Sequence, residues 1–248
     1  MRHINFTIMT VAIIALASSA GASVLYDGAM NTLPAAQDWL YATDPVIGAS
    51  ATQSAGGGVT TLDTTPDVLD HAGYFAGTTH PGLTALDRTG DGFTLSFTLA
   101  LLSELHVSND RAGLSILVLT SDLQAIELGF WADSVWAQST AFTRAEATAP
   151  GFTTAAATEY DLAVLGDNYN LYADDVLILS GPLRSYYLTA AHPIYGLPNL
   201  LFLGDDTTSA KGEFELARVE FLDEAIPEPA TMSLLALGAM AVLKRRRA

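Results

Sequence analysis

The residue types best suited to binding chemistry in this sequence are two neighbouring tryptophans and one carboxylate. Trp131 and Trp136 lie close together, and Glu127 precedes them in an otherwise apolar run. Aromatic rings stack on the apolar faces of sugars, while a few polar groups fix the hydroxyls. These three residues therefore suggest a sugar-binding patch. The simpler interpretation, which we prefer, places both tryptophans in a core and Glu127 on the solvent face of a sheet.

A second candidate site is a short acidic loop that could hold calcium. Asp205 and Asp206 follow Gly204, and main-chain carbonyls of the loop add further oxygens, which are the ligands that calcium prefers. Asn109 and Asp110 would add ligands if the two loops met. The sequence contains no Asp-x-Asp-x-Asp-Gly loop, and a turn that caps itself through side-chain hydrogen bonds explains these residues more simply. The sequence therefore predicts no cofactor, with calcium as the alternative.

Residues for hydrolysis do not follow any of the familiar patterns. Neither a His-Glu-x-x-His motif nor a Gly-x-Ser-x-Gly motif occurs, so zinc-dependent and serine-dependent hydrolysis have no support. Glu213 and Glu215 are spaced to share one face of a strand. Beside Lys211 they are more simply interpreted as solvated edge residues. We therefore expect a protein that is not an enzyme.

Short β-like runs separated by turn residues must position these side chains. Residues 93–101 alternate between large apolar and small polar side chains, which predicts a half-buried strand. Residues 114–120 and 124–131 predict a central hairpin, with Ile126 on one face and Glu127 on the other. Further runs predict a three-stranded meander at 160–165, 168–173 and 176–180, and strands at 200–203 and 214–222 with a bulge near 216–217.

Eight or more short strands joined by Gly, Asp and Asn turns in about 200 residues favour an antiparallel sandwich over a barrel. The meander, with its turns Gly166-Asp167-Asn168 and Asp174-Asp175, resembles the back sheet of concanavalin A-like lectin and glucanase jelly rolls, including laminin-G-like modules. The segments 109–114, 127–131 and 203–210 are similar to bacterial secreted modules called choice-of-anchor domains.

This resemblance implies an all-β, antiparallel jelly-roll β-sandwich of the concanavalin A-like type, with no established activity. Another all-β architecture is the alternative. Glucanases of this fold carry a Glu-x-Asp-x-x-Glu pattern on one strand for retaining hydrolysis. That pattern is absent from the sequence.

Residues 23–226 form a strongly acidic body. Of the 27 acidic residues in the chain only Glu228 lies outside this range, and only six basic residues lie within it, so its net charge is −20. Such a surface repels phosphate backbones and anionic lipid, which excludes nucleic acid as a partner. Metal cations, basic proteins and neutral glycans remain compatible with it. Because the chain has no cysteine, its stability must come from a core rather than from disulfides.

The first 22 residues have the pattern of a secretory signal peptide. Arg2 gives a positive start, residues 8–17 are apolar, and the small residues Ala20 and Ala22 predict cleavage after Ala22. A buried N-terminal helix is the alternative, but no capping residue or packing pattern supports it. We therefore expect the chain to be exported.

The C-terminal residues 225–248 combine three elements. The triplet Pro227, Glu228 and Pro229 precedes the uncharged residues 230–243. As a helix, this uncharged run would span about 21 Å, less than the roughly 30 Å hydrocarbon core of a bilayer. The basic tail that follows comprises Lys244, Arg245, Arg246 and Arg247. These cations would stay on the cytoplasmic side and leave the body outside, so the sequence predicts a short transmembrane helix.

This tripartite end resembles the PEP-CTERM sorting signal of Gram-negative bacteria. In that family a membrane-embedded enzyme, exosortase, is taken to recognise the triplet, cut nearby and pass the protein to a surface or matrix anchor. The resemblance implies this sorting role for Pro227, Glu228 and Pro229. Prolines keep the triplet extended and present its carboxylate at the membrane surface. The resemblance also implies that the chain is anchored transiently in the inner membrane and is then transferred to the cell surface or the extracellular matrix. An unprocessed tail anchor is the alternative.

The sequence thus predicts a signal peptide at 1–22, a β-sandwich at 23–224 and a sorting signal at 225–248. The function that we expect is display of a non-catalytic sandwich at the surface or in the matrix, with exosortase as processing partner. The alternative is a carbohydrate-binding or carbohydrate-active sandwich that acts on extracellular polysaccharide through a site that the sequence does not declare.

Overall fold

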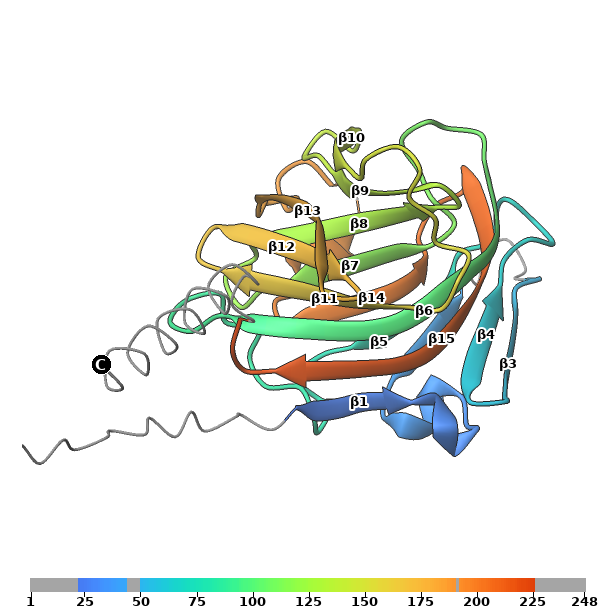
Figure 1. Ribbon diagram of the computed structural model, residues 1–248, viewed down its shortest axis with the longest axis horizontal. Coiled ribbons are helices and arrows are strands. Elements are labelled where there is room, and N and C mark those ends of the chain that lie inside the picture. The colour runs from blue at the N-terminus through green and yellow to red at the C-terminus, as the bar shows by residue number, and fades with distance from the viewer. Residues whose placement is uncertain (1–21, 44–49, 191, 226–248) are drawn as a thin grey trace, which may run out of the picture.

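The computed structural model describes residues 22–43, 50–190 and 192–225, which form two antiparallel β-sheets packed face to face (Figure 1). The expected signal peptide, apart from an exposed Ala22, and the sorting signal from residue 226 onward lie outside the described residues. Within the described ranges no helix is long and apolar enough to cross a membrane. The 3-10 helices are η1 (Gly28–Met30), η2 (Pro34–Gln37) and η3 (Pro193–Gly196).

One sheet has eight strands in the order β13-β12-β11-β6-β15-β4-β3, with β1 also paired to β15. These strands are β1 (Ser23–Asp27), β3 (Thr52–Gly56), β4 (Val59–Asp63), β6 (Phe93–His106), β11 (Thr158–Leu165), β12 (Asn168–Ala173), β13 (Val176–Pro182) and β15 (Ala210–Leu222). The predicted meander is confirmed as β11, β12 and β13. The predicted bulge is confirmed by a register shift of β15 between Leu216 and Arg218, where its pairing with β4 gives way to pairing with β1.

The other sheet has seven strands in the order β10-β9-β8-β7-β14-β5-β2. Its strands are β2 (Leu40–Thr43), β5 (Ala72–Ala76), β7 (Ser115–Leu119), β8 (Ala125–Trp131), β9 (Ser134–Gln138), β10 (Arg144–Ala147) and β14 (Leu200–Asp205). The predicted hairpin is confirmed as β7 and β8, which lie near the middle of this sheet.

The main core fills the space between the sheets. Because side chains alternate along a strand, Ile126, Leu128 and Phe130 of β8 all face inward and are fully buried. The ring of Phe130 meets that of Phe97 on β6 edge to face, with ring centroids 6.3 Å apart. The periodicity of the sequence therefore identified the core face of β8 correctly.

The strand predicted at residues 93–101 is longer and more buried than expected. It continues to His106 as β6, and its polar side chains Thr94 and Ser96 are buried. Ser96 Oγ donates a hydrogen bond to Asp161 on β11, and Thr94 Oγ1 donates to the carbonyl of Glu224 at 2.9 Å. The half-buried prediction was wrong because small hydroxyl side chains can be buried where they find hydrogen-bond partners.

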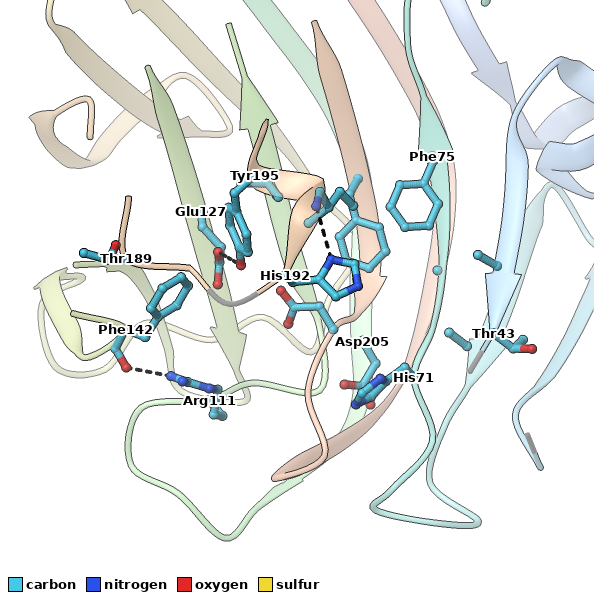
Figure 2. Close-up of a pocket in the computed structure, with 17 residues that line it drawn as sticks. Thr43, His71, Phe75, Arg111, Glu127, Phe142, Thr189, His192, Tyr195 and Asp205 are labelled. Carbon is cyan, nitrogen blue, oxygen red and sulfur yellow. Dashed lines mark hydrogen bonds between the residues drawn. The ribbon is translucent and has the colours of Figure 1, made fainter. Parts of the chain in front are cut away.

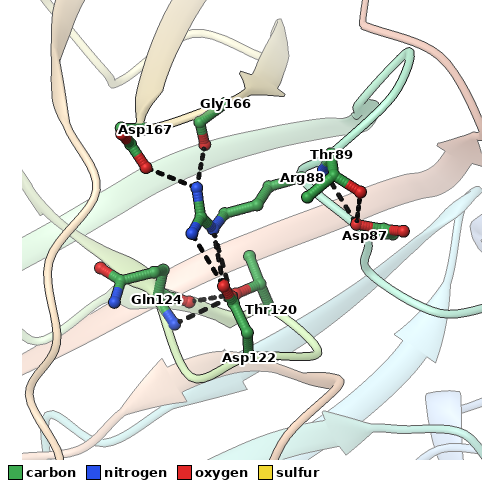
Figure 3. Close-up of polar contacts among 8 residues, drawn as sticks. All are labelled: Asp87, Arg88, Thr89, Thr120, Asp122, Gln124, Gly166 and Asp167. Atoms are coloured by element: carbon green, nitrogen blue, oxygen red, sulfur yellow. Dashed lines mark hydrogen bonds and ion pairs between the residues drawn. The ribbon is translucent and has the colours of Figure 1, made fainter.

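A single arginine connects turns of the two sheets (Figure 3). Arg88 donates from Nε and Nη2 to the carboxylate of Asp122 in the β7–β8 turn, at 3.0 and 2.8 Å to Oδ2. Its Nη1 donates to the carbonyl of Gly166, at 3.0 Å, and to the carboxylate of Asp167, both in the β11–β12 turn. The Arg88 guanidinium is the main reason that the pKa of Asp122 falls to about 2.

A second apolar layer covers the outer face of the seven-stranded sheet. The chain between β13 and β14 crosses this face, and Arg184 forms an isolated bridge with Ala125 at the start of β8. The layer comprises Leu117, Leu119, Ala125, Tyr186, Tyr195, Leu200 and Phe202. The centre of this sheet is therefore buried on both faces, and the covered outer face contains the candidate site.

Candidate functional site

The second layer leaves a cavity of about 650 Å³ on the outer face of the seven-stranded sheet (Figure 2). Strands β2, β5, β7, β8 and β14 contribute to its walls. Its apolar lining includes Phe75, Leu117, Phe142, Ile194, Tyr195 and Phe202. Its titratable lining includes His71, Arg111, Glu127, His192, Asp205 and Asp206. The cavity thus combines an aromatic wall with a small number of polar groups.

Glu127 on β8 lines this cavity with only 5 % of its surface exposed. The hydroxyl of Tyr195 donates to Glu127 Oε2 at 2.7 Å, whereas Oε1 has no hydrogen-bond partner within the described part of the chain. Burial raises the pKa of Glu127 to about 8; the nearby Asp206 adds to this rise, and the hydrogen bond from Tyr195 opposes it. Our preference for a solvent-facing Glu127 was wrong because the second layer covers this face.

Tyr186 fixes the backbone beside Glu127. The amide of Glu127 donates to the Tyr186 hydroxyl at 3.3 Å, and that hydroxyl donates to the carbonyl of Gln138 at 2.7 Å. Burial raises the pKa of both Tyr186 and Tyr195, so both hydroxyls stay protonated and serve as donors. Hydrogen bonds from Tyr195 to the carboxyl group and from the amide to Tyr186 therefore position Glu127.

Asp206 follows β14 and lies across β7 from β8, the strand of Glu127. Ser115 Oγ donates to Asp206 Oδ1 at 3.1 Å. Burial raises the pKa of Asp206, while the hydrogen bond from Ser115 and the charges of Arg111 and His71 lower it. Glu127 and Asp206 are thus two carboxyl groups with the same direction of pKa shift.

The predicted calcium ligands, Asp205 and Asp206, engage different partners. Asp205 accepts from Thr64 Oγ1 at 2.7 Å and from the amide of Thr207 at 3.1 Å, and burial raises its pKa to about 8. Asp110 accepts from the amide of Arg144 instead of joining them. Across residues 22–43, 50–190 and 192–225, no group of three or more His, Asp or Glu side chains is placed to hold a metal ion.

Arg111 holds two loops together at one end of the cavity. Its Nη1 donates to the carbonyls of Asp110 and Phe142, both at 2.6 Å. Its guanidinium carbon lies 5.6 Å from the centre of the Phe142 ring, a cation–π distance. The ring of Phe142 also meets that of Tyr195, with centroids 5.4 Å apart. Arg111 therefore positions the aromatic wall and places a positive charge beside it.

The two tryptophans are buried and their rings pack against each other instead of forming the less favoured sugar-stacking patch. Trp131 is 8 % exposed and Trp136 is 2 % exposed. His106 stacks on the Trp131 ring at 3.9 Å between centroids, and the guanidinium carbon of Arg144 lies 4.3 Å from that ring. Trp131 Nε1 donates to the carbonyl of Arg111 at 2.8 Å, so the pair supports the loop that carries Arg111.

Sequence reasoning selected Glu127, Asp205 and Asp206, which line the cavity, but missed Tyr195 and Arg111. Tyr195 lies 68 residues from its hydrogen-bond partner Glu127, and no local pattern connects them. Arg111 offered a weak signal as one of six basic residues in an acidic body. The predicted sorting residues from Pro227 to Pro229, the basic tail and Ala20 lie outside the described residues.

Residues 225–247 match the PEP-CTERM protein-sorting motif, which confirms the sorting signal predicted from the tail. Such a signal indicates export and exosortase-dependent sorting with a C-terminal membrane anchor in Gram-negative bacteria. No curated protein matches the chain in sequence.

Several solved structures share the architecture. A Bacillus subtilis protein of unknown function with a galectin-like fold aligns at a TM-score of 0.50 and 10 % identity, over 83 % of this chain and 98 % of that chain. A carbohydrate esterase from Shiga toxin-encoding bacteriophage phi24B aligns at a TM-score of 0.54 and 12 % identity, over 82 % of this chain and 97 % of that chain. The potassium-bound carbohydrate recognition domain of Emp46p aligns at a TM-score of 0.50 and 12 % identity, over 82 % of this chain and 98 % of that chain. The predicted concanavalin A-like antiparallel β-sandwich is confirmed; at these identities the likeness concerns the fold alone.

Proposed function

We propose that this chain is an exported display protein whose β-sandwich binds a glycan in the outer-face cavity without cleaving it. The observation that carries the proposal is the cavity, in which an aromatic wall faces a few buried polar groups. Its volume of about 650 Å³ is typical of small-molecule sites, which measure about 300 to 1,000 Å³. The proposal combines the expected display role with the carbohydrate-binding alternative.

The chemistry of the lining favours a sugar over a purely apolar ligand. Phe142 and Tyr195 offer ring faces for stacking, while Glu127, Arg111 and His192 can donate or accept hydrogen bonds to hydroxyls. Two structural neighbours are named a carbohydrate recognition domain and a carbohydrate esterase. Their names agree with this ligand class and do not identify a particular sugar.

The carboxyl groups support binding rather than acid–base catalysis. Hydrolysis by a carboxyl pair needs one protonated acid and one ionised carboxylate, which requires environments that push the two pKa values apart. Here burial raises the pKa of Glu127 and of Asp205 to about 8 and also raises that of Asp206. The cavity therefore shifts all three pKa values in one direction.

The sorting signal supports display outside the cell. We propose that exosortase cuts near Pro227-Glu228-Pro229 while the apolar run at 230–243 anchors the chain in the inner membrane, and that the sandwich is then passed to the surface or the extracellular matrix. The charge of −20 on the body would keep it soluble and away from anionic lipid.

The experiment that tests glycan binding is affinity electrophoresis through gels containing soluble polysaccharides, followed by a glycan array. It uses the chain from Ser23 onward in mild detergent. We expect retention by at least one polysaccharide and loss of retention in Phe142→Ala, since this change removes one ring of the aromatic wall. No reducing ends should appear during incubation with the retained glycan.

The matched control is Tyr187→Ala, which removes an exposed aromatic ring that does not line the cavity. It should leave retention unchanged, and thermal unfolding of both variants should show that they fold. Equal retention of Phe142→Ala and the parent chain, or retention by no glycan at all, would contradict the proposal.

A further inference from the structure

The cavity holds more carboxyl groups than fixed positive charges. Among the described residues that line it, Glu127, Asp205 and Asp206 face a single guanidinium, that of Arg111. Nη1 of this guanidinium already donates to two backbone carbonyls. Arg111 alone therefore does not balance the three groups when they ionise.

Glu127 also has an unused oxygen. The Tyr195 hydroxyl takes Oε2, whereas Oε1 has no partner within the described ranges, although the side chain is only 5 % exposed. Oε1 is not one of the fully buried polar atoms that lack a partner, so it is accessible from the cavity that Glu127 lines. An acceptor left open inside a cavity is suited to a donor on a ligand.

Resting on the proposed glycan-binding function, we infer that this cavity selects a sugar with a free ammonium group, an amino sugar of a cationic glycan, with Glu127 and Asp206 as its counter-charges. The ammonium donates to the open oxygen of Glu127. The sugar ring lies against Phe142 and Tyr195, whose faces also attract a cation.

Other charge classes fit the cavity less well. An anionic sugar would approach a body of charge −20 and meet three carboxyl groups, which is unfavourable at both long and short range. A neutral sugar could bond to the same atoms, but only an ammonium forms hydrogen bonds to the carboxylates in which donor and acceptor are both ionised. The excess of carboxyl groups over guanidinium groups in the cavity thus favours a cationic sugar.

Binding of an ammonium should also release protons. Around Glu127 the titratable groups are Tyr195, Tyr186, Asp206 and Arg111, with His71 next to Asp206. The pKa of Glu127 is about 8 in the empty cavity, so its carboxyl group is protonated at neutral pH. A bound cation favours the ionised form, and the displaced proton goes to the buffer.

The test is isothermal titration calorimetry of the chain from Ser23 onward, in mild detergent at about pH 6.5. Its probes are a glucosamine oligomer, an N-acetylglucosamine oligomer and a glucose oligomer, all of the same length. We expect the glucosamine oligomer to bind at least about tenfold tighter than the other two. Measurements in two buffers of different ionisation enthalpy should show net proton release for this oligomer alone.

Glu127→Gln should reduce the preference for the glucosamine oligomer over the two neutral oligomers to about twofold or less, because the ammonium loses its counter-charge. Its control is Glu213→Gln on β15 of the opposite sheet, which should change nothing. Circular dichroism and thermal unfolding establish that both variants fold.

Several results separate the possible failures. Equal affinity for charged and neutral oligomers would overturn the ammonium inference and leave glycan binding standing. Binding of none of the sugars would overturn both. A lysine trimer that binds as tightly as the amino sugar, or an equal loss of preference in Glu213→Gln, would show nonspecific charge attraction and would also overturn the inference.

Discussion

Glu127 makes the stability of the sandwich depend on pH. Its pKa lies near 4.5 when it is solvated and at about 8 in the fold, chiefly because burial disfavours the ionised form. A carboxyl group whose pKa is raised by folding contributes fully below its unfolded pKa, and this contribution is lost as the pH rises toward the folded pKa. Stability should therefore fall between about pH 4.5 and pH 8.

We predict that Glu127→Gln flattens this part of the stability curve. At about pH 9 the variant should be more stable than the parent by more than about 1 kcal/mol, because it has no ionised carboxylate to bury. At about pH 5 the difference should be small, since the parent carboxyl group is then protonated. Urea denaturation at a series of pH values measures both, and Glu213→Gln serves as the control. Parallel curves for Glu127→Gln and the parent would contradict the prediction.

At the scale of elements, two paired glycines on strands beneath the cavity have no room for a side chain. Gly73 of β5 lies opposite Gly204 of β14. A Cβ at Gly73 would lie 2.2 Å from the Phe202 ring, and a Cβ at Gly204 would lie 2.4 Å from the carbonyl oxygen of Ala72. Gly204 also has a φ of 152°, which side chains rarely allow. Gly73 therefore leaves room for the Phe202 ring, and Gly204 leaves room for the backbone of β5.

We predict that Gly204→Ala destabilises the chain by about 2 to 4 kcal/mol, because backbone strain adds to a steric clash with another strand. Chemical denaturation measures this loss. Gly56→Ala is the matched control, since a Cβ there meets nothing within 4 Å, and it should change stability by about 0.5 kcal/mol or less. A similar small effect at Gly204 would show that β5 and β14 can separate without cost.

At the scale of the whole molecule, charge is divided by position along the chain. The body carries −20, whereas four of the eleven basic residues of the chain lie at 244–247. Positive residues beside an apolar run tend to stay in the cytoplasm, and the acidic body is free to leave. The sorting motif at 225–247 joins these two parts.

We predict that exosortase processing removes the apolar run at 230–243 and the basic tail. Mass spectrometry of the protein recovered from the cell surface or medium should show a C-terminus near Pro229. In Glu228→Ala, which removes the single carboxylate of the triplet, the unprocessed chain should stay in the inner membrane. Glu224→Ala, just before the motif, is the control and should be processed normally. A surface protein that still ends at Ala248 would contradict the prediction.

The sequence by itself determined those features that depend on local order. The alternation at Ile126, Leu128 and Phe130 identified the core face of β8, since a strand places every second side chain on one face. The turn residues around Gly166 and Asp174 located the meander. The Pro-Glu-Pro triplet, the apolar run and the basic tail identified the sorting signal, because neighbouring residues alone make it recognisable.

Only the tertiary structure decided what covers each face and which side chains meet there. Alternation placed Glu127 on the outer face of β8 but contained no information about the segment that later packs on that face. Tyr195 contacts Glu127 from 68 residues away, while Trp131, a member of the less favoured sugar-binding patch, is covered by His106 and Arg144. Contacts between distant segments depend on how the chain closes on itself, and the burial that raises the pKa of Glu127 is a product of that closure.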